Sequence, residues 1–513
     1  MTRREQLAEL LGSLSLATES AVGVPPETSI RAAVVSVSLA RALELSDRDC
    51  AAVYLVSLLR YIGCSGFASE TAWYGGGDDI SLLGDLTPVD GGKPLDVVST
   101  IVRKAGRGQP IGSRVRAVSR ALRNPALPQA LATAHCTQAV ALTESLGLGL
   151  EIPRALGDIY ERFDGRGGPA QKRGDQISPI ARVVRTALAV VIHAAIEGPD
   201  AAVEVVRSRL GGEFDPSVAR AFLGAPAMLK AVMMSSGWDA FVAANPPGWC
   251  DERAPLDVEA IALSFARCVD LKSPWTLSHS TGVATLCRSA LEHAGAAPDE
   301  AAAGYVSGLL HDLGRLSVPN GIWDKKGPLN PIELTRMRTH VSVSEAVVSR
   351  SSLLAGHAGA VGAHHERLDG SGYPRQTSGR SSSRVALTLA AADVMHALLE
   401  DRPHRPKRSI DDAAAVVRED VRAGRLDARA ADTVCAAAGA RTSRLKGELP
   451  LGLSEREGEV LALLARGLSN KEIGSALFIS ARTAGNHIAH IYEKTGINTR
   501  AGAALFAVTR GLV

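Results

Sequence analysis

The sequence predicts an all-α protein made of two related helical bundles in tandem, followed by a small third helical unit. Ala and Leu dominate a composition that is 46% hydrophobic but only 4% aromatic, which favours helices over sheets. From Ile30 to Leu59 the apolar positions recur every three or four residues, the spacing of packed helices. A chain of 513 residues is also too long for a single hydrophobic core.

The net charge and the cysteine content indicate which partners and which cellular compartment to expect. The formal net charge of +3 is close to neutral, so composition alone requires no nucleic-acid partner. The seven cysteines are odd in number and form no CxxC pair, as expected in a reducing compartment. We see no apolar run of about 18 residues suited to a bilayer and no N-terminal signal region. We therefore expect a soluble, cytoplasmic protein that does not engage membranes.

An internal repeat links the first two parts of the chain. Residues 56–64 resemble residues 306–315, and residues 159–169 resemble residues 364–374. In both copies a histidine stands 24 residues before the second of these segments. A spacing kept across three anchors indicates an internal duplication. We place the first copy at 1–245, ahead of a Pro-Pro-Gly break, the second at 256–440, and the third unit at 449–513.

The first copy lacks the polar residues that stand out in the second. Where the second copy has His279, His311, Asp312, His364, His365 and Asp393, the first has Thr28, Arg60, Tyr61, Ile159, Tyr160 and Val190. Only His340 keeps a counterpart, His135. Because the scaffold survives without these side chains, packing does not require them. We expect the first copy to bind no metal and to serve regulation or dimerisation.

The second copy supplies imidazoles and carboxylates in the proportions of a two-metal hydrolytic site. Its candidate metal ligands are His279, His311, Asp312, His340, His364, His365 and Asp393. His311 and Asp312 are neighbours on an expected helix, where adjacent side chains point about 100° apart and do not converge on one ion. Two ions resolve this geometry, because an aspartate can give one oxygen to each. We expect two divalent ions (Fe, Mn or Zn) that activate water for attack on phosphorus.

Structural explanations stay open for single residues of this set. A lone buried histidine is usually a hydrogen-bonded core residue, which is what we expect of His135, His193 and His396. The glycines beside Tyr373 could form an ordinary turn. Arg402 and Arg405 could lie on a solvated face.

Residues 265–410 resemble the HD-GYP family, whose members are helical, metal-dependent phosphodiesterases that open cyclic di-GMP or related dinucleotides. The resemblance is carried by His311-Asp312, the His364-His365 pair, Gly372-Tyr373-Pro374 and Asp393, with His279 and His340 at the family's spacing. It implies that His279, His311, Asp312 and Asp393 bind one ion, and that Asp312, His340, His364 and His365 bind the other. It also implies catalytic roles for Asp312 and Arg315 and substrate contacts from Gly372, Tyr373, Pro374, Arg402 and Arg405.

Three positions depart from the family pattern. Arg315 stands where the family usually has Lys, and His396 stands where it usually has Asp. Trp275 occupies the place of a glutamate that supports a third ion in some members. We therefore expect two ions rather than three.

The C-terminal unit carries the start and stop signals of three short helices. Ser454 with Glu457, and Ser469 with Glu472, form two capping boxes, and Ser480 caps a third helix. Gly467 is expected to end the first of these helices. Two short helices, a tight turn and a third helix with a polar face predict a helix-turn-helix.

This unit resembles the LuxR-type DNA-binding domain, notably in Leu-Ser-x-Arg-Glu, Gly-Leu-Ser-Asn-Lys-Glu-Ile and Ser-x-Arg-Thr-x-x-x-His. The resemblance implies double-stranded DNA as partner, with candidate contacts from Lys471, Arg482, Thr483, Asn486, His487, Lys494 and Arg500. Gly485 stands where the family has Lys, and residues 449–513 carry only +2. Binding by a single unit should therefore be weak and salt-sensitive, and we expect a homodimer. A protein–protein module is the alternative for this unit.

The leading hypothesis is a LuxR-type transcription regulator that carries a cyclic-dinucleotide or other phosphodiester hydrolase. A DNA-binding sensor that holds a nucleotide without turnover is the second hypothesis, motivated by Arg315 and His396. A dimeric helical scaffold is the third.

Overall fold

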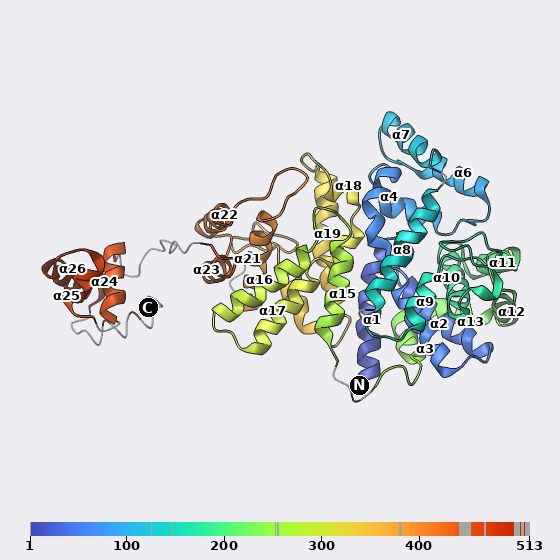
Figure 1. Cartoon of the computed structure of the whole chain (residues 1–513), viewed down its shortest axis with the longest axis horizontal. Helices are drawn as coiled ribbons and strands as arrows, with labels where there is room; N and C mark the ends of the chain where they lie inside the picture. The colour runs from blue at the N-terminus through green and yellow to red at the C-terminus, as the bar shows by residue number, and fades with distance from the viewer. Residues whose placement is uncertain are drawn as a thin grey trace. The chain divides into compact units, whose positions relative to one another are not determined.

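A computed structural model describes residues 2–440 apart from 125, 145, 252, 254, 255 and 379–381, residues 453–496 apart from 466 and 467, and residues 503 and 507. Across these residues the secondary structure is helical, with isolated bridges but no strand. The all-α prediction is confirmed. The chain divides into two compact units, residues 1–441 and 442–513, each considered by itself (Figure 1).

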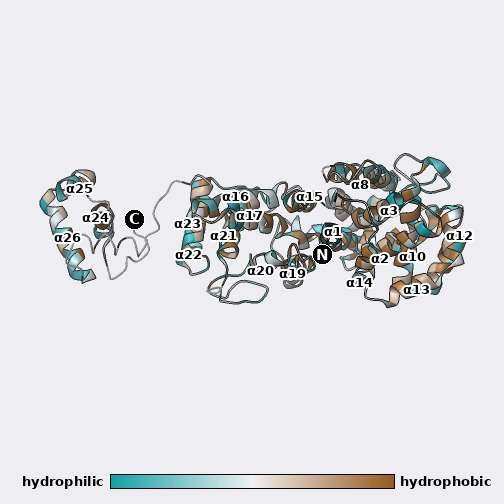
Figure 2. Ribbon diagram, turned by 90° about the horizontal axis from the view of Figure 1, so that it is seen from below, coloured by the Kyte–Doolittle hydropathy of each residue, from teal (hydrophilic) through white to brown (hydrophobic). Residues whose placement is uncertain are grey.

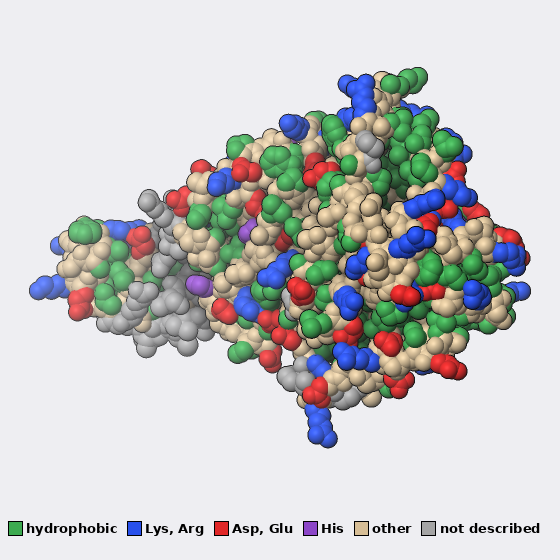
Figure 3. Space-filling model, turned by 45° about the vertical axis from the view of Figure 1, so that its right-hand side comes forward, with side chains coloured by type: hydrophobic (Ala, Val, Ile, Leu, Met, Phe, Trp, Pro, Cys, Tyr) green, Lys and Arg blue, Asp and Glu red, His purple; other side chains and the backbone are tan. Residues whose placement is uncertain are grey.

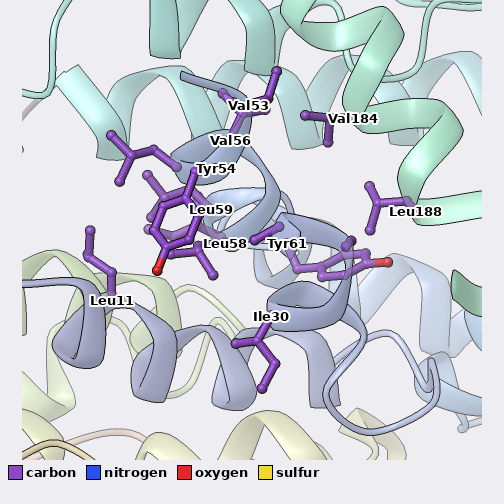
Figure 4. Packing of buried hydrophobic residues seen from close by; sticks show 14 of the residues in the cluster. Leu11, Ile30, Val53, Tyr54, Val56, Leu58, Leu59, Tyr61, Val184 and Leu188 are labelled. Carbon is purple, nitrogen blue, oxygen red and sulfur yellow. The ribbon is translucent and has the colours of Figure 1, made fainter. Parts of the chain in front are cut away.

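The first repeat is a bundle around three apolar helices, α2, α3 and α10. Its helices are α1 (Arg3–Ser20), α2 (Thr28–Ala42), α3 (Asp47–Leu59), α8 (Leu127–Glu144), α9 (Glu151–Gly157) and α10 (Pro179–Glu197), followed by α11 (Pro199–Arg209), α12 (Pro216–Gly224), α13 (Ala227–Met234) and α14 (Gly237–Ala244). Figure 2 shows apolar residues concentrated where α2, α3 and α10 meet. Figure 4 shows Ile30, Tyr54 and Val184 in this buried cluster.

An insertion follows α3 in the first repeat. It comprises the 3-10 turn η1 (Cys64–Phe67) and helices α4 (Ala68–Gly75), α5 (Asp79–Leu86), α6 (Pro94–Lys104) and α7 (Ile111–Leu122). As a result, 75 residues separate Arg60 from His135, against 29 between His311 and His340. Helix α4 contacts the second repeat.

The second repeat has the same order of main helices and shares a core with the first. Its elements are α15 (Val258–Asp270), α16 (His279–His293), α17 (Pro298–Leu310), η3 (Leu313–Ser317), α18 (Asn320–Trp323), α19 (Pro331–Val348), η4 (Ala355–His357), α20 (Ala358–Val361), α21 (Arg384–Leu398), α22 (Ile410–Arg422) and α23 (Ala428–Ala437). One buried cluster runs from Leu11 of α1 to Phe265 and Leu309 of the second repeat. Helices α15 and α19 lie beside the first repeat (Figure 1).

The two repeats use the same local devices at matching positions. The residues before α2 and α16, Glu27 and Ser278, are both left-handed, with φ of 65° and 66°. A carboxylate from the preceding helix accepts from the amide of the second residue of each helix, Glu19 from Ser29 at 2.8 Å and Asp270 from Ser280 at 2.9 Å. Such agreement is what a duplication predicts.

One sequence pairing between the repeats is wrong. Helices α10 and α21 start directly after Ser178 and Ser383, whose separation equals that of residues 159 and 364. In this register the counterpart of Asp393 is Leu188, not Val190. Matching the histidines of the two apolar helices shifted the alignment by two residues.

The expectation that no apolar stretch is long enough for a bilayer is also wrong. Asp47–Gly75 and Pro179–Glu197 are long and apolar enough to cross a membrane by length and composition. However, 78% and 67% of their most apolar windows are buried inside the protein. Burial in the protein core therefore explains why these helices are so apolar.

The C-terminal unit has the three expected helices, α24 (Glu455–Ala465), α25 (Asn470–Leu477) and α26 (Ala481–Thr495). Each starts directly after the serine predicted to cap it, and both capping boxes form. Val460, Ile473 and Ile491 are fully buried between the helices. The predicted helix end at Gly467 lies outside the described residues.

Candidate metal centre

Five elements of the second repeat bring the seven candidate ligands to one buried point. His279 is the first residue of α16, and His311-Asp312 follows the last turn of α17. His340 lies in α19, His364-His365 follows α20, and Asp393 lies in α21. All are buried except His365, whose side chain is 22% exposed. Residues spread over 115 positions of sequence therefore share one centre.

The two aspartates stand between two groups of histidines. Asp312 Oδ2 lies 3.6 Å from His279 Nε2 and 3.4 Å from His311 Nε2, while its Oδ1 lies 3.5 Å from His340 Nε2. Asp393 Oδ1 lies 3.3 Å from His279 Nε2, and its Oδ2 lies 3.6 Å from His365 Nδ1. Each carboxylate thus faces both groups, whereas the sequence assigned that position to Asp312 alone.

Three histidines are oriented by their own helix. The Nδ1–H groups of His311, His340 and His364 donate to the carbonyls three residues earlier, at 2.7, 2.6 and 2.6 Å. These hydrogen bonds leave each Nε2 lone pair free to face the centre.

The donors fit metal ions. Ligand atoms of His279, His311 and Asp312 lie within 4.8 Å of one another, as do those of His340, His364 and His365. His364 Nε2 is buried and has no hydrogen-bond partner among the residues that the structure describes. A buried imidazole nitrogen without a partner is costly, and an ion would satisfy it.

Electrostatics hold His364 and Asp312 in the forms that bind cations, whereas His279 must lose a proton to bind one. Burial, with His311 and His340 nearby, lowers the pKa of His364 to about 3, so its ring is neutral. Burial alone would raise the pKa of Asp312, but His311 and Arg315 hold it well below its usual range. Burial opposes protonation of His279, yet Asp393 and Glu400 raise its pKa to about 9.

Glu400 is a functional candidate that the sequence did not reveal. As the first residue of α16, His279 has no earlier helical carbonyl to hold its Nδ1. Glu400 Oε2 takes that role at 2.9 Å and also accepts from Arg402 at 2.7 Å. His396, one turn before Glu400, places Nδ1 3.5 Å from its other oxygen. The available signal was the acidic residue one turn after a position where the family has Asp.

A cavity of about 660 Å³ opens beside the centre. Its lining includes Tyr373, Arg402 and Arg405 of the candidate substrate contacts, together with Trp275 and Trp323. A second cavity of equal volume, lined by residues of the first repeat such as Gly76 and Lys104, contains no histidine. The donor set, not the volume, therefore distinguishes the site.

The remaining candidates around the cavity have structural partners. Gly372 and Pro374 are not among the described lining residues. A Cβ at Gly372 would lie 2.4 Å from the Arg367 amide, so the tight turn explains this glycine. Arg405 donates to the carbonyls of Ala397, at the end of α21, and of Glu400, and Arg315 donates to Asp312 Oδ2 at 2.8 Å.

In the C-terminal unit, Lys471, Arg482 and Asn486 are exposed. His487 is half-buried, and Thr483 bonds the capping hydroxyl of Ser480 at 2.7 Å. Lys494 donates to Glu457 of α24 at 2.7 Å, a contact that ties α26 to α24. Arg500 lies outside the described residues.

Two protein-family models match parts of the chain. Residues 264–430 match the HD domain family, and residues 451–507 match the luxR family of bacterial regulatory proteins.

Curated relatives include phosphodiesterases. The 3′3′-cGAMP-specific phosphodiesterase 3 of Vibrio cholerae is 28% identical over 81% of this chain and 91% of its own length. The 3′3′-cGAMP-specific phosphodiesterase 1 of the same organism is 36% identical, over 35% of this chain and 41% of its own length. A cyclic di-GMP phosphodiesterase of Thermotoga maritima is 37% identical over 20% of this chain and 29% of its own length.

A solved structure is similar to most of the chain. The crystal structure of a cyclic GMP-AMP-specific phosphodiesterase of V. cholerae matches with a TM-score of 0.57 and 25% identity, over 85% of this chain and 98% of that chain. The chain thus carries an HD domain of the metal-dependent phosphohydrolase type, fused to a LuxR-type DNA-binding domain.

Proposed function

We propose that the second repeat hydrolyses a cyclic dinucleotide at two divalent ions and that the C-terminal unit binds DNA. The observation that carries the first half is the position of Asp312, whose two oxygens face separate histidine groups at 3.4–3.6 Å. An aspartate placed in this way suits a bridge between two ions, a common arrangement in phosphodiester hydrolysis.

The ligands divide between two positions. His279, His311, Asp312 and Asp393 would hold one ion; Asp312, His340, His364 and His365 would hold the other. When bound, the ions supply a water of lowered pKa and neutralise charge on the phosphate. Imidazole with carboxylate suits Fe, Mn or Zn.

The chain's own residues orient the reaction. Glu400 orients His279 by accepting its Nδ1–H. Arg402 lines the cavity beside Glu400, where its guanidinium can bind a phosphate oxygen. In hydrolysis, the water oxygen joins phosphorus, the bond to the leaving ribose oxygen breaks, and that oxygen takes up a proton. One phosphodiester of the ring is thereby opened and a linear dinucleotide results.

The substrate class follows from the cavity and from the relatives. About 660 Å³ is within the range of sites for compact ligands. Trp275 and Trp323 offer flat faces for bases, while Arg402 and Lys326 offer cations for phosphates. A cyclic dinucleotide combines these features, and 3′3′-cGAMP and cyclic di-GMP are the first to test.

Metal analysis combined with a substrate panel tests this function. The purified protein is assayed for bound Fe, Mn and Zn and then incubated with 3′3′-cGAMP, cyclic di-GMP and a simple phosphodiester. We expect about two ions per chain and a linear product that disappears in His311→Ala. A metal-loaded protein that opens none of these substrates would refute the proposal.

The C-terminal unit is proposed to bind DNA as part of a homodimer in the cytoplasm. Lys471 and Arg482 are exposed around α25 and α26, and Asn486 lies on the exposed face of α26. The small net charge of +2 over residues 449–513 favours two units acting together. On the face of the whole chain that Figure 3 shows, acidic and basic side chains are interspersed.

A DNA-retardation series at several salt concentrations tests this half. Arg482→Ala should weaken binding and lower the slope of log affinity against log salt by about 1. Arg429→Ala, at an exposed arginine of α23, should leave both unchanged. No retardation even at low salt would contradict DNA binding.

A nucleotide sensor without turnover is the second candidate. It is favoured by Arg315, which donates to Asp312 Oδ2, the oxygen closest to His311. Binding of a dinucleotide with no product formed, at full metal content, would select this reading.

A further inference from the structure

One wall of the metal cavity is not held by the second repeat alone. Helix α18 contributes Ile322 and Trp323 to the cavity lining. The Trp323 indole lies edge-on to His340, with ring centroids 5.5 Å apart, and the Arg315 guanidinium lies 4.2 Å from its centroid. A shift of α18 would therefore reach both the cavity surface and a candidate metal ligand.

Asp79 of the first repeat fixes the start of α18. Its carboxylate is fully buried. Oδ1 accepts the backbone amide of Asn320, the first residue of α18, at 2.7 Å. Oδ2 accepts from Lys272 Nζ at 2.9 Å, and the two charged side chains are only 1% and 3% exposed. A buried ion pair with these hydrogen bonds holds one geometry, because breaking it leaves an uncompensated charge.

Further hydrogen bonds tie both ends of α18 to the same region. Asn320 Nδ2 donates to the Lys272 carbonyl at 2.6 Å and to Ser69 Oγ at 2.8 Å. At the other end, Asp324 accepts from Ser69 at 3.0 Å and from Ser273 at 2.5 Å. Ser69 belongs to α4 of the insertion, so two helices of the first repeat clamp α18.

The backbones also meet directly. The Gly321 amide donates to the Gly77 carbonyl at 2.9 Å. A Cβ added at Gly321 would lie 2.3 Å from that oxygen, so only glycine allows this approach. The contact leaves little freedom for α18 to move away from the first repeat.

We propose that the first repeat supports one wall of the nucleotide site, and that Asp79 is a positioning residue that sets α18 and Trp323 against the cavity. This inference rests on the proposed phosphodiesterase function. The residues that clamp α18 come from an insertion that the second repeat lacks, so the first repeat supports a wall that the second repeat supplies.

Kinetics of the full-length, metal-loaded protein test the proposal. Asp79→Asn should raise KM for the hydrolysed dinucleotide about tenfold or more, because misplacement by about 1 Å is costly. Metal content should match the wild type, because His340, the candidate ligand beside Trp323, is held by a hydrogen bond to the Met337 carbonyl of its own helix. Asp79→Leu combined with Lys272→Met removes both charges and guards against misfolding caused by an unpaired lysine. Lys104→Met, which breaks a half-exposed pair with Asp85 in the same insertion, is the matched control and should leave KM unchanged.

Hydrogen exchange supplies a readout that does not need turnover. Amides of residues 318–329 should exchange faster in both Asp79 variants and not in Lys104→Met. If the wild type hydrolyses nothing, the proposed function fails, and this exchange still decides whether Asp79 positions the wall. Unchanged exchange, or faster exchange with KM unchanged in an active protein, would overturn the inference.

Discussion

At the centre of the first repeat lies the guanidinium of Arg60, and at the equivalent point of the second repeat seven candidate ligands converge. Arg60 Nη1 donates to His135 Nε2 at 3.1 Å and lies 4.2 Å from the centroid of the Tyr160 ring. The His135 ring then donates from Nδ1 to the Cys64 sulfur at 3.0 Å. The first repeat has a permanent cation where we propose that the second holds ions.

The difference separates what the fold needs from what the chemistry needs. Gly63 and Gly314 serve both repeats in the same way, since a Cβ at either would lie 2.2 or 2.0 Å from the carbonyl of His135 or His340. Backbone devices of this kind are shared, whereas the carboxylates are not. A centre can therefore lose its ligands and keep its packing, provided that another group satisfies the remaining histidine.

Removing the shared carboxylate should give the largest contrast between the repeats. Asp312→Ala is expected to abolish metal retention and to lower the hydrolysis rate by at least about 10³-fold, because it takes a ligand from both ion positions. Arg60→Met, at the matching centre, should leave metal content unchanged. Elemental analysis and initial rates measure both, and equal metal loss in the two variants would show that the repeats do not differ in this way.

Loss of the support behind His279 should have the next largest effect. Glu400→Gln is expected to weaken metal binding about 10–100-fold, since it removes the charged acceptor of the Nδ1–H bond. Asp401→Asn, at the adjacent acidic residue, is the control and should bind as the wild type. Competition with a chelator of known affinity gives the values, and an unaltered Glu400→Gln would remove Glu400 from the site.

Acidity should affect the two centres differently. The pKa of His279 is raised to about 9, so its ring is protonated at neutral pH and an ion must displace that proton. Metal affinity should therefore rise by at most about tenfold per pH unit towards pH 9 and then level off. Burial and Arg60 keep the pKa of His135 well below its usual range, so the first repeat should contribute no such dependence. Calorimetry in buffers of different ionisation enthalpy measures the released proton, and a flat profile would contradict the assignment.

The paired glycines allow the finest test. Gly63→Ala and Gly314→Ala should each lower the free energy of unfolding by about 1–3 kcal/mol, because a methyl group is forced against a backbone carbonyl. Only Gly314→Ala displaces α19 at His340, so only this variant should also lose some metal affinity. Thermal unfolding and metal titration of the two proteins, side by side, provide the measurements. Similar metal affinities would mean that His340 tolerates the shift.

Local signals in the sequence were sufficient for some elements and not for others. The starts of three helices could be predicted from the capping residues Ser454, Ser469 and Ser480, because the capping pattern lies within four consecutive residues. The candidate ligands stood out because histidine is infrequent, with 13 among the 513 residues of the chain. Glu400 was not recognised, because its place one turn after His396 is a weak local signal and its contact with His279 forms only when the chain is folded.

Contacts between distant parts of the chain, and the alignment of one helix, could not be predicted from local sequence. The contact of Asp79 with Asn320 joins residues 241 positions apart and has no sequence periodicity. The two-residue error at Leu188 arose because an uninterrupted apolar helix offers no anchor except its cap. Sequence thus predicts helix caps and candidate ligands well, and predicts poorly which distant segment supports a cavity.

The hydrogen bonds that Arg402 and His279 both donate to Glu400 have a thermodynamic consequence. A phosphate that attracts Arg402 alters the environment of the carboxylate on which His279 depends. Occupancy of the cavity and retention of an ion are then linked equilibria. By thermodynamic reciprocity, the nucleotide changes the metal affinity by the same factor by which the metal changes the nucleotide affinity.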